Sequence, residues 1–213
     1  MKKLILIRHG QSTLFGKNLT GGFTDEPLSD LGREQAHLTG KRLAEMVKDT
    51  SNAGFYCSDL KRAYETAQII GSYITLKPTE DAALRDLNNG EAAYKTKDEA
   101  KLLELPMIGP LMNWVPYPGA ENWRTFYKRV NEFMNLLKLK DYDTVIIVSH
   151  FTTSWNIVHW WFNLPEDLMT TMGFKQNLCG IHILSMGKWD IGDKIILKLN
   201  STAHLEQLDK KLE

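Results

Sequence analysis

The chain has 213 residues, of which 43% are hydrophobic and 24% are charged, as in ordinary soluble globular proteins. Lysine plus arginine and aspartate plus glutamate each total 26, so the formal net charge is zero. These values exclude disordered, collagen-like and coiled-coil chains, and the balanced charge argues against nucleic acid as a partner. The length predicts one domain covering residues 1–213.

No segment of the sequence predicts a membrane protein. The first apolar run, Leu4 to Ile7, is four residues long. A secretion signal needs an apolar stretch of about 7–15 residues and a membrane-spanning helix needs about 20. The two cysteines, Cys57 and Cys179, lie far apart and lack the spacing of metal ligands. We therefore interpret them as free thiols and expect a cytoplasmic protein.

Apolar runs alternate with amphipathic stretches, a pattern that predicts a layered α/β domain. Strands are expected at residues 4–7, 54–58, 145–148, 181–186 and 194–199, the last two as a hairpin around residues 187–192. Helices are expected from the cap Ser29 to about residue 48, from 60 to 73 with Asp59 as the cap, from 121 to 137, and from 153 to 162.

Residues 86–119 break this alternation. The segment holds four of the seven prolines in the chain and one short predicted helix, which Thr96 and Glu99 begin with a capping box. An insert of this length in a compact domain often serves as a lid or a binding wall. We therefore expect a lid-like insert and not a separate domain.

Two predicted strands end in histidine: His9 follows the first strand, and His150 follows the strand at 145–148. Ligands of open α/β sheets bind outside the carboxyl ends of the strands, so the two histidines can share one site. Each histidine alone is weak evidence, because a histidine after a strand is more often a hydrogen-bonded structural group. The other histidines show no metal-ligand spacing, which predicts a site without metal.

Four motifs occur in a characteristic order and spacing. They are Arg8-His9-Gly10-Gln11-Ser12, Leu28-Ser29-Asp30-Leu31-Gly32-Arg33-Glu34-Gln35-Ala36, Ser58-Asp59-Leu60-Lys61-Arg62-Ala63-Tyr64-Glu65-Thr66-Ala67 and Ser149-His150. Together they resemble the histidine phosphatase superfamily, which includes the cofactor-dependent phosphoglycerate mutases. The resemblance extends from Leu4 to about Leu199 and implies a three-layer sandwich, with a mixed, mainly parallel central sheet between helices.

The resemblance implies that His9 is the nucleophile and forms a phosphohistidine. Its attacking nitrogen must be neutral, so its other nitrogen must be held as a donor. A phosphate ester dianion repels a nucleophile until its charge is neutralised. Arg8 and Arg62 can each bind two phosphate oxygens through the guanidinium fork, and a protonated His150 adds a third donor.

The proton donor is where the sequence departs from the family. The family pattern is Leu-x-Glu-x-x-x-Gly, and this chain has Asp86 at the glutamate position. Histidine acid phosphatases, another branch, resemble this chain in using aspartate as the donor. Glu91 is the rival donor, and an ion pair of Asp86 with Arg85 is the structural alternative.

The stretch from Asn18 to Asp25 resembles the mutase pattern Asn-Arg-Phe-Thr-Gly-Trp-x-Asp. It makes Asn18 and Gly22 candidates for phosphate binding and Gly21 a candidate for substrate contact, although a plain Gly-Gly turn explains the glycines equally well. Ser12 in the first motif is a further substrate-contact candidate.

Lys97 and Phe151 complete the candidate substrate contacts. Lys97 lies near the spacing of a substrate-binding lysine of mutases, although a solvated helix start explains it as well. Phe151 stands where the family usually has glycine, and it can narrow the pocket, stack on a substrate or belong to the core.

Three functions are compatible with these residues. The first is a metal-independent and cofactor-free phosphatase that hydrolyses a small phosphorylated metabolite through phosphohistidine. The second is phosphoglycerate mutase-type phosphoryl transfer, which the Asn18–Asp25 stretch favours. The third is a catalytically weak module that binds phosphoesters or protein. Only about 63 residues separate Asp86 from His150, fewer than in mutases, and a short cap leaves the site open to water. The sequence therefore predicts the phosphatase.

Overall fold

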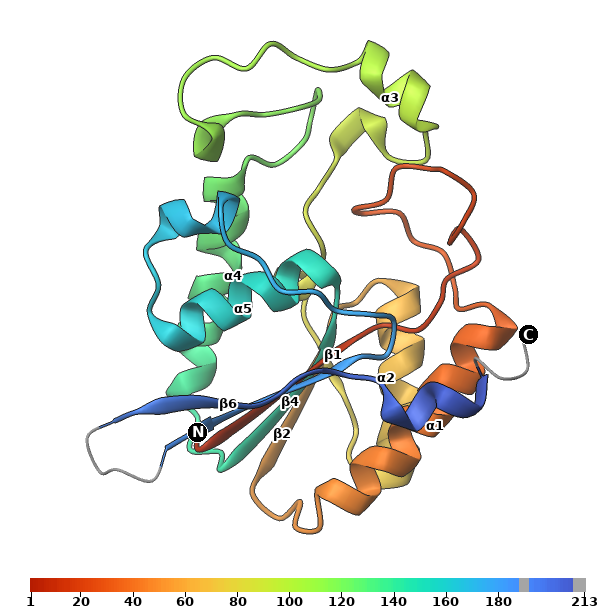
Figure 1. Ribbon diagram of the computed structural model, residues 1–213, viewed down its shortest axis with the longest axis vertical. Helices are drawn as coiled ribbons and strands as arrows, with labels where there is room; N and C mark the ends of the chain where they lie inside the picture. The colour runs from red at the N-terminus through yellow and green to blue at the C-terminus, as the bar shows by residue number, and fades with distance from the viewer. Residues whose placement is uncertain (188–191, 209–213) are drawn as a thin grey trace.

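A six-stranded sheet forms the centre of the computed structural model, which describes residues 1–187 and 192–208 (Figure 1). The strands lie in the order β3-β2-β4-β1-β5-β6. β1 and β2 both pair with β4 in parallel, and β3 pairs with β2 in parallel. β5 is antiparallel to β1, and β6 is antiparallel to β5. The prediction of a mixed, mainly parallel sheet is therefore confirmed. The strands are β1 Lys3–Arg8, β2 Ala53–Cys57, β3 Thr79–Glu80, β4 Thr144–Ser149, β5 Ile181–Met186 and β6 Lys194–Ser201.

Helices cover both faces of the sheet and complete the three layers (Figure 1). They are α1 Asp30–Met46, α2 Lys61–Ile74, α3 Lys97–Leu102, α4 Trp123–Lys138 and α5 Phe151–Phe162. β1 and β4 each contain a continuous apolar run. Because successive side chains of a strand point to opposite faces, both faces of these strands are apolar. Leu4, Leu6, Val145 and Ile147 pack with α4 and α5, whereas Ile5, Ile7, Ile146 and Val148 pack with α1 and α2.

One of the two predicted helix caps, Ser29 and Asp59, is present in the structure. Ser29 caps α1 as predicted, because its hydroxyl accepts from the backbone N–H of Gly32. The prediction that Asp59 caps α2 is wrong. Arg85 binds the Asp59 carboxylate at 2.8 and 2.5 Å, and Asp25 accepts from the first backbone N–H of α2, that of Lys61, at 2.8 Å. A carboxylate from another segment thus replaces the local cap.

Other boundaries differ by a few residues. α4 begins after Asn122, whose side chain accepts from the N–H of Thr125, and α5 begins directly after His150. The two-residue strand β3 carries no apolar alternation and was not predicted. The hairpin of β5 and β6 is confirmed, although residues 188–191 of its predicted loop lie outside the described residues.

The expected insert lies beyond the carboxyl end of β4, with α3 at the top of the view in Figure 1. Thr96 and Glu99 form the predicted capping box at the start of α3. The backbone of Leu19 forms a β-bridge with that of Thr96, which ties the loop after β1 to the insert. Among the described residues, none of the helices has both the length and the apolar character needed to cross a membrane.

Candidate active site

The two strand-end histidines meet at one edge of the sheet, as predicted. β1 and β4 are parallel neighbours with Ile7 opposite Val148, so His9 and His150 leave the sheet side by side. Their ring centroids lie 5.0 Å apart. The backbone N–H of His9 also donates to the carbonyl oxygen of Ser149, at 2.9 Å, which fixes the two strand ends relative to each other.

The hydrogen bonds of His9 define its tautomer. Nδ1 lies 2.7 Å from the carbonyl oxygen of Gly10, which can only accept, so Nδ1 carries the proton. Nε2 lies 3.2 Å from Nε of Arg62, which can only donate, so Nε2 holds the free electron pair. Burial, together with the charges of Arg62 and Arg8, lowers the pKa of His9 well below its usual value. His9 is therefore a neutral imidazole whose Nε2 carries a free electron pair.

His150 is also neutral, and it is fully buried. Its Nδ1 accepts from Arg62 Nη2 at 3.1 Å, and its Nε2–H donates to the hydroxyl of Ser58 at 3.0 Å. Burial is the main cause that lowers the pKa of His150, and the positive charge of Arg62 lowers this pKa further. A protonated His150 thus requires a nearby anion, since a negative charge favours the imidazolium.

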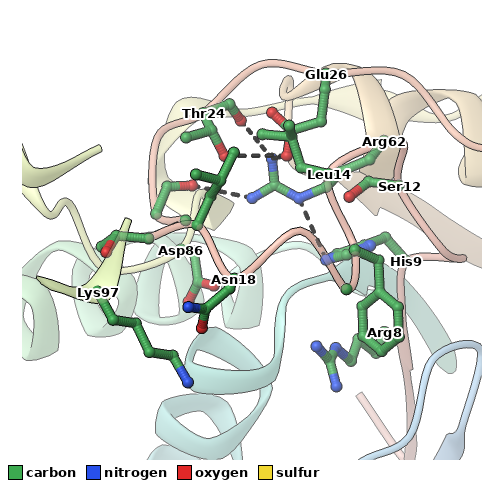
Figure 2. Close-up of a pocket in the computed structure, with 16 residues that line it drawn as sticks. Arg8, His9, Ser12, Leu14, Asn18, Thr24, Glu26, Arg62, Asp86 and Lys97 are labelled. Atoms are coloured by element: carbon green, nitrogen blue, oxygen red, sulfur yellow. Dashed lines mark hydrogen bonds and ion pairs between the residues drawn. The ribbon is translucent and has the colours of Figure 1, made fainter. Parts of the chain in front are cut away.

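Arg62, the second residue of α2, is the centre of the site (Figure 2). Besides the two histidines, it donates to the carbonyl oxygens of Gly22, at 2.9 Å, and Thr24. Its Nη1 lies 3.6 Å from a carboxylate oxygen of Glu26. Arg62 is 4% exposed, so these contacts hold the guanidinium firmly between the loop and the histidines.

Arg8 is held from the other side. Its Nη1 donates to the carbonyl oxygen of Gln176 at 2.9 Å, and its guanidinium carbon lies 5.7 Å from the centre of the Phe151 ring. This is a cation–π distance. Phe151 is not among the residues that line the pocket, which argues against its prediction as a direct substrate contact. Its ring contacts both Arg8 and Trp155, whose ring centre lies 6.1 Å away.

A pocket of about 440 Å³ opens over these groups (Figure 2). Nine predicted site residues line it: Arg8, His9, Ser12, Asn18, Gly21, Gly22, Arg62, Asp86 and Lys97. His150 lies beneath the lining, behind Arg62. Seven further lining residues were not predicted: Leu14, Phe15, Gly16, Leu19, Thr20, Thr24 and Glu26. Leu19, Thr20 and Thr24 lie within the mutase-like stretch and Glu26 directly follows it, so the stretch was the available signal for these four. Leu14 to Gly16 have no chemical signature.

The two adjacent glycines have different roles. Gly22 has φ of +88°, and a Cβ there would lie 2.6 Å from the carbonyl oxygen of Leu87, so this position requires glycine. Gly21 has open space around its Cβ position. The carbonyl oxygen of Gly22 binds Arg62, so Gly22 orients the arginine.

Asp86, the predicted proton donor, lines the pocket together with a second carboxyl group, that of Glu26. Its Oδ1 accepts from the backbone N–H of Leu87 at 3.0 Å, and the hydroxyl of Thr152 also donates to it. Burial is the largest influence and raises the pKa of Asp86, whereas Arg62 opposes this rise. Arg85 pairs with Asp59 and leaves Asp86 free of that partner. The rival donor, Glu91, is exposed and does not line the pocket.

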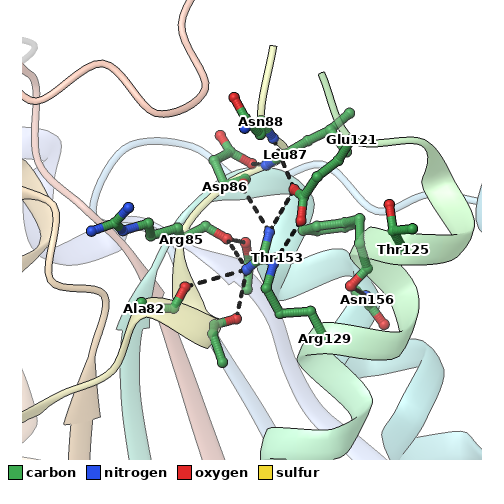
Figure 3. A network of polar contacts seen from close by, with 12 residues as sticks. Ala82, Arg85, Asp86, Leu87, Asn88, Glu121, Thr125, Arg129, Thr153 and Asn156 are labelled. Atoms are coloured by element: carbon green, nitrogen blue, oxygen red, sulfur yellow. Dashed lines mark hydrogen bonds and ion pairs between the residues drawn. The ribbon is translucent and has the colours of Figure 1, made fainter. Parts of the chain in front are cut away.

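A second arginine holds the segment that carries Asp86 (Figure 3). Arg129 of α4 donates to the carbonyl oxygens of Ala83, Arg85 and Asp86 at 2.9, 3.2 and 3.1 Å. Its Nε and Nη2 each bind one oxygen of Glu121 at 2.8 Å. This pair therefore holds the backbone of the segment that carries Asp86, a contact that the sequence did not predict.

Known proteins share this sequence pattern and fold. Residues 4–200 match the sequence model of the histidine phosphatase superfamily (branch 1). A Hydrogenobacter thermophilus protein named "Putative phosphoserine phosphatase 2" is 32% identical over 98% of this chain and 100% of its own. A 2,3-bisphosphoglycerate-dependent phosphoglycerate mutase of Allorhizobium ampelinum is 35% identical over 60% of this chain and 62% of its own.

Solved structures show the same fold at lower identity. The mycobacterial glucosyl-3-phosphoglycerate phosphatase superposes with a TM-score of 0.75 at 22% identity, covering 94% of this chain and 99% of its own. The α-ribazole phosphatase of Shigella flexneri superposes with a TM-score of 0.75 at 22% identity, covering 93% and 96%. With a family match across nearly the whole chain and a relative at 32% identity over its full length, the chain belongs to the histidine phosphatase superfamily.

Proposed function

We propose that the chain is a phosphatase that hydrolyses a small phosphomonoester through a phosphohistidine on His9. The observation that carries this proposal is the tautomer of His9. Its proton is held on Nδ1 by Gly10, so the electron pair of Nε2 lies beside Arg62, in a pocket that Arg8 and Asp86 also line. Nucleophile, anion-binding groups and acid are thus within one site.

In the first step, the phosphoryl group enters between Arg62 and the histidines. The two donors that Arg62 gives to His9 and His150 then turn to phosphate oxygens, and Arg8 binds a further oxygen. Nε2 of His9 attacks phosphorus, the ester P–O bond breaks, and Asp86 gives its proton to the departing oxygen. The Gly10 carbonyl oxygen stabilises the imidazole cation that carries the phosphoryl group.

In the second step, water attacks the phosphohistidine. Asp86, now a carboxylate, accepts the proton from that water, and the N–P bond breaks with its electron pair returning to Nε2. Inorganic phosphate leaves, and the starting protonation states of both residues are restored. The proposed cycle consumes only ester and water, so we expect it to need no metal or cofactor, and we expect it to operate in the cytoplasm.

Phosphoglycerate mutase-type transfer is the second candidate. The Asn18–Asp25 stretch supports it, because Asn18, Gly22 and Asp25 match the mutase pattern. Asn18 and Gly22 line the pocket, as does Lys97. The relative named as a mutase supports it as well. In this reaction the phosphoryl group returns from His9 to substrate before water reaches it.

One experiment separates the two candidates. Purified protein in EDTA is given a panel of phosphomonoesters, including phosphoserine and 3-phosphoglycerate with and without 2,3-bisphosphoglycerate. We expect steady phosphate release, and no release by the His9→Ala variant, whereas His37→Ala, which changes an exposed surface histidine, serves as the matched control. Conversion of 3- to 2-phosphoglycerate without phosphate release establishes the mutase. Phosphate release by His9→Ala contradicts the proposed nucleophile.

A further inference from the structure

Glu26 places a buried negative charge beside the arginine that binds phosphate. Its side chain is 10% exposed and lines the pocket. Oε1 accepts from the hydroxyl of Thr24 at 3.0 Å and lies 3.6 Å from Arg62 Nη1. Within the described part of the chain, Oε2 is buried and has no hydrogen-bond partner. A buried carboxylate with an unpaired oxygen is costly, and its presence at this position calls for a role.

The contacts of Arg62 suggest what that role is. Its guanidinium already has carbonyl partners on Gly22 and Thr24, which orient it without any carboxylate. Glu26 adds a charge and no short hydrogen bond, since 3.6 Å is beyond hydrogen-bond distance. Its main effect on Arg62 is therefore electrostatic.

The charge balance of the pocket shows the consequence. Arg8 and Arg62 together supply two positive charges, which match a phosphate dianion. With Glu26 as a carboxylate, these three side chains sum to one positive charge, so together with a dianion they carry an excess negative charge. Lys97 also lines the pocket, but this sum concerns Glu26 and the two arginines. Charges a few ångströms apart in a partly buried site interact strongly, so this excess weakens anion binding.

We propose that Glu26 is a positioning residue that moderates Arg62, lowering the affinity of the pocket for inorganic phosphate so that the product leaves after each turnover. This inference rests on the proposed function, since it takes phosphate as the product bound by Arg62. The sequence pattern of the first motif and the mutase-like stretch ends at Asp25, so Glu26 lies just outside the residues on which the resemblance depends.

The test is the binding of inorganic phosphate to Glu26→Gln, measured by isothermal titration calorimetry. Glutamine keeps the shape and the acceptor for Thr24 but removes the charge. We expect the dissociation constant for phosphate to fall about tenfold. The inhibition constant for phosphate and KM should fall in parallel, and kcat should fall because the product leaves more slowly. Glu26→Asp, which retains the charge, should bind phosphate within about threefold of the wild type.

Glu45→Gln is the matched control, because it also removes a carboxylate paired with an arginine, Arg42, but on the exposed surface of α1. It should leave phosphate binding unchanged. If folded Glu26→Gln binds phosphate as weakly as the wild type or more weakly, Glu26 serves only the structure and the inference fails. If neither the wild type nor Glu26→Gln binds phosphate, the proposed function fails with the inference, so calorimetry distinguishes the two failures without relying on turnover.

Discussion

Replacing Arg129 by methionine tests whether α4 controls the acid in the pocket. Methionine keeps the apolar stem that packs near Phe126 but removes the bonds to Glu121 and to the carbonyl oxygens of Ala83, Arg85 and Asp86. The Arg129 and Glu121 side chains are only 22% and 18% exposed. Removing one partner of a largely buried pair costs about 3 kcal/mol, because the other charge is left without a partner. At about 2–4 °C per kcal/mol, Tm should fall by about 6–12 °C.

The same change should reveal itself in catalysis. The Asp86 segment loses its anchor, and a displacement of about 1 Å in a catalytic group can cost about 100-fold in rate. We expect kcat for an alkyl phosphate to fall at least about tenfold. An aryl phosphate should lose much less, because its leaving group needs little protonation. The assay is the alkyl-to-aryl ratio of kcat, measured well below the Tm of the variant.

Two further variants make this prediction refutable. Arg124→Met changes another arginine of α4, one that binds Glu166 and Asn113 and touches none of the Asp86 segment, and should keep the wild-type ratio. The double variant Glu121→Gln/Arg129→Met should recover part of the lost stability, because no buried carboxylate is left unpaired. Unchanged Tm in Arg129→Met, or equal loss on both esters, would refute the reasoning.

The remaining predictions concern protonation and metal. Asp86→Asn should slow alkyl esters more than aryl esters, and in the wild type alkyl turnover should decline as pH rises through the raised pKa of Asp86; full activity of the variant on an alkyl ester would overturn the donor assignment. Burial lowers the pKa of His182 to about 4, and its Nδ1 accepts from the N–H of Asn200. The folded state thus favours the neutral ring. The free energy of unfolding therefore includes about 3 kcal/mol from His182 above about pH 6.5, and this part is lost as the pH falls toward 4, because the unfolded chain binds the proton first. Denaturant titrations across this range should show a shallower loss for His182→Gln. Activity should persist in EDTA and be inhibited by vanadate; a loss that a divalent metal restores would contradict the metal-free cycle.

The parts of the fold that depend on neighbours in sequence were predictable. The apolar runs of β1 and β4, the cap of α1 by Ser29 and the capping box of Thr96 all follow from residues within a few positions of each other. The meeting of His9 with His150 also follows, because residues at the carboxyl ends of parallel neighbouring strands share one edge of the sheet.

Contacts between distant segments could not be predicted in this way. Asp59 had a cap position beside α2, yet Arg85 binds its carboxylate, and Asp25 caps the helix from 36 residues away. Phe151 directly follows His150 in the sequence and was a candidate for substrate contact, yet its ring lies against the Arg8 guanidinium. In each case several partners were chemically suitable, and local spacing does not rank them.

The candidate site likewise has features that the sequence predicts and features that only the tertiary structure determines. Motif order and the family resemblance predicted His9, Arg8, Arg62 and Asp86 as site residues, and these four line one pocket. The tautomer of His9, the neutral state of His150, the charge of Glu26 beside Arg62 and the anchoring of Asp86 by Arg129 depend on distances of a few ångströms. Packing of the whole chain sets these distances, since hydrogen bonds and ion pairs weaken steeply with separation and the order of residues alone does not specify them.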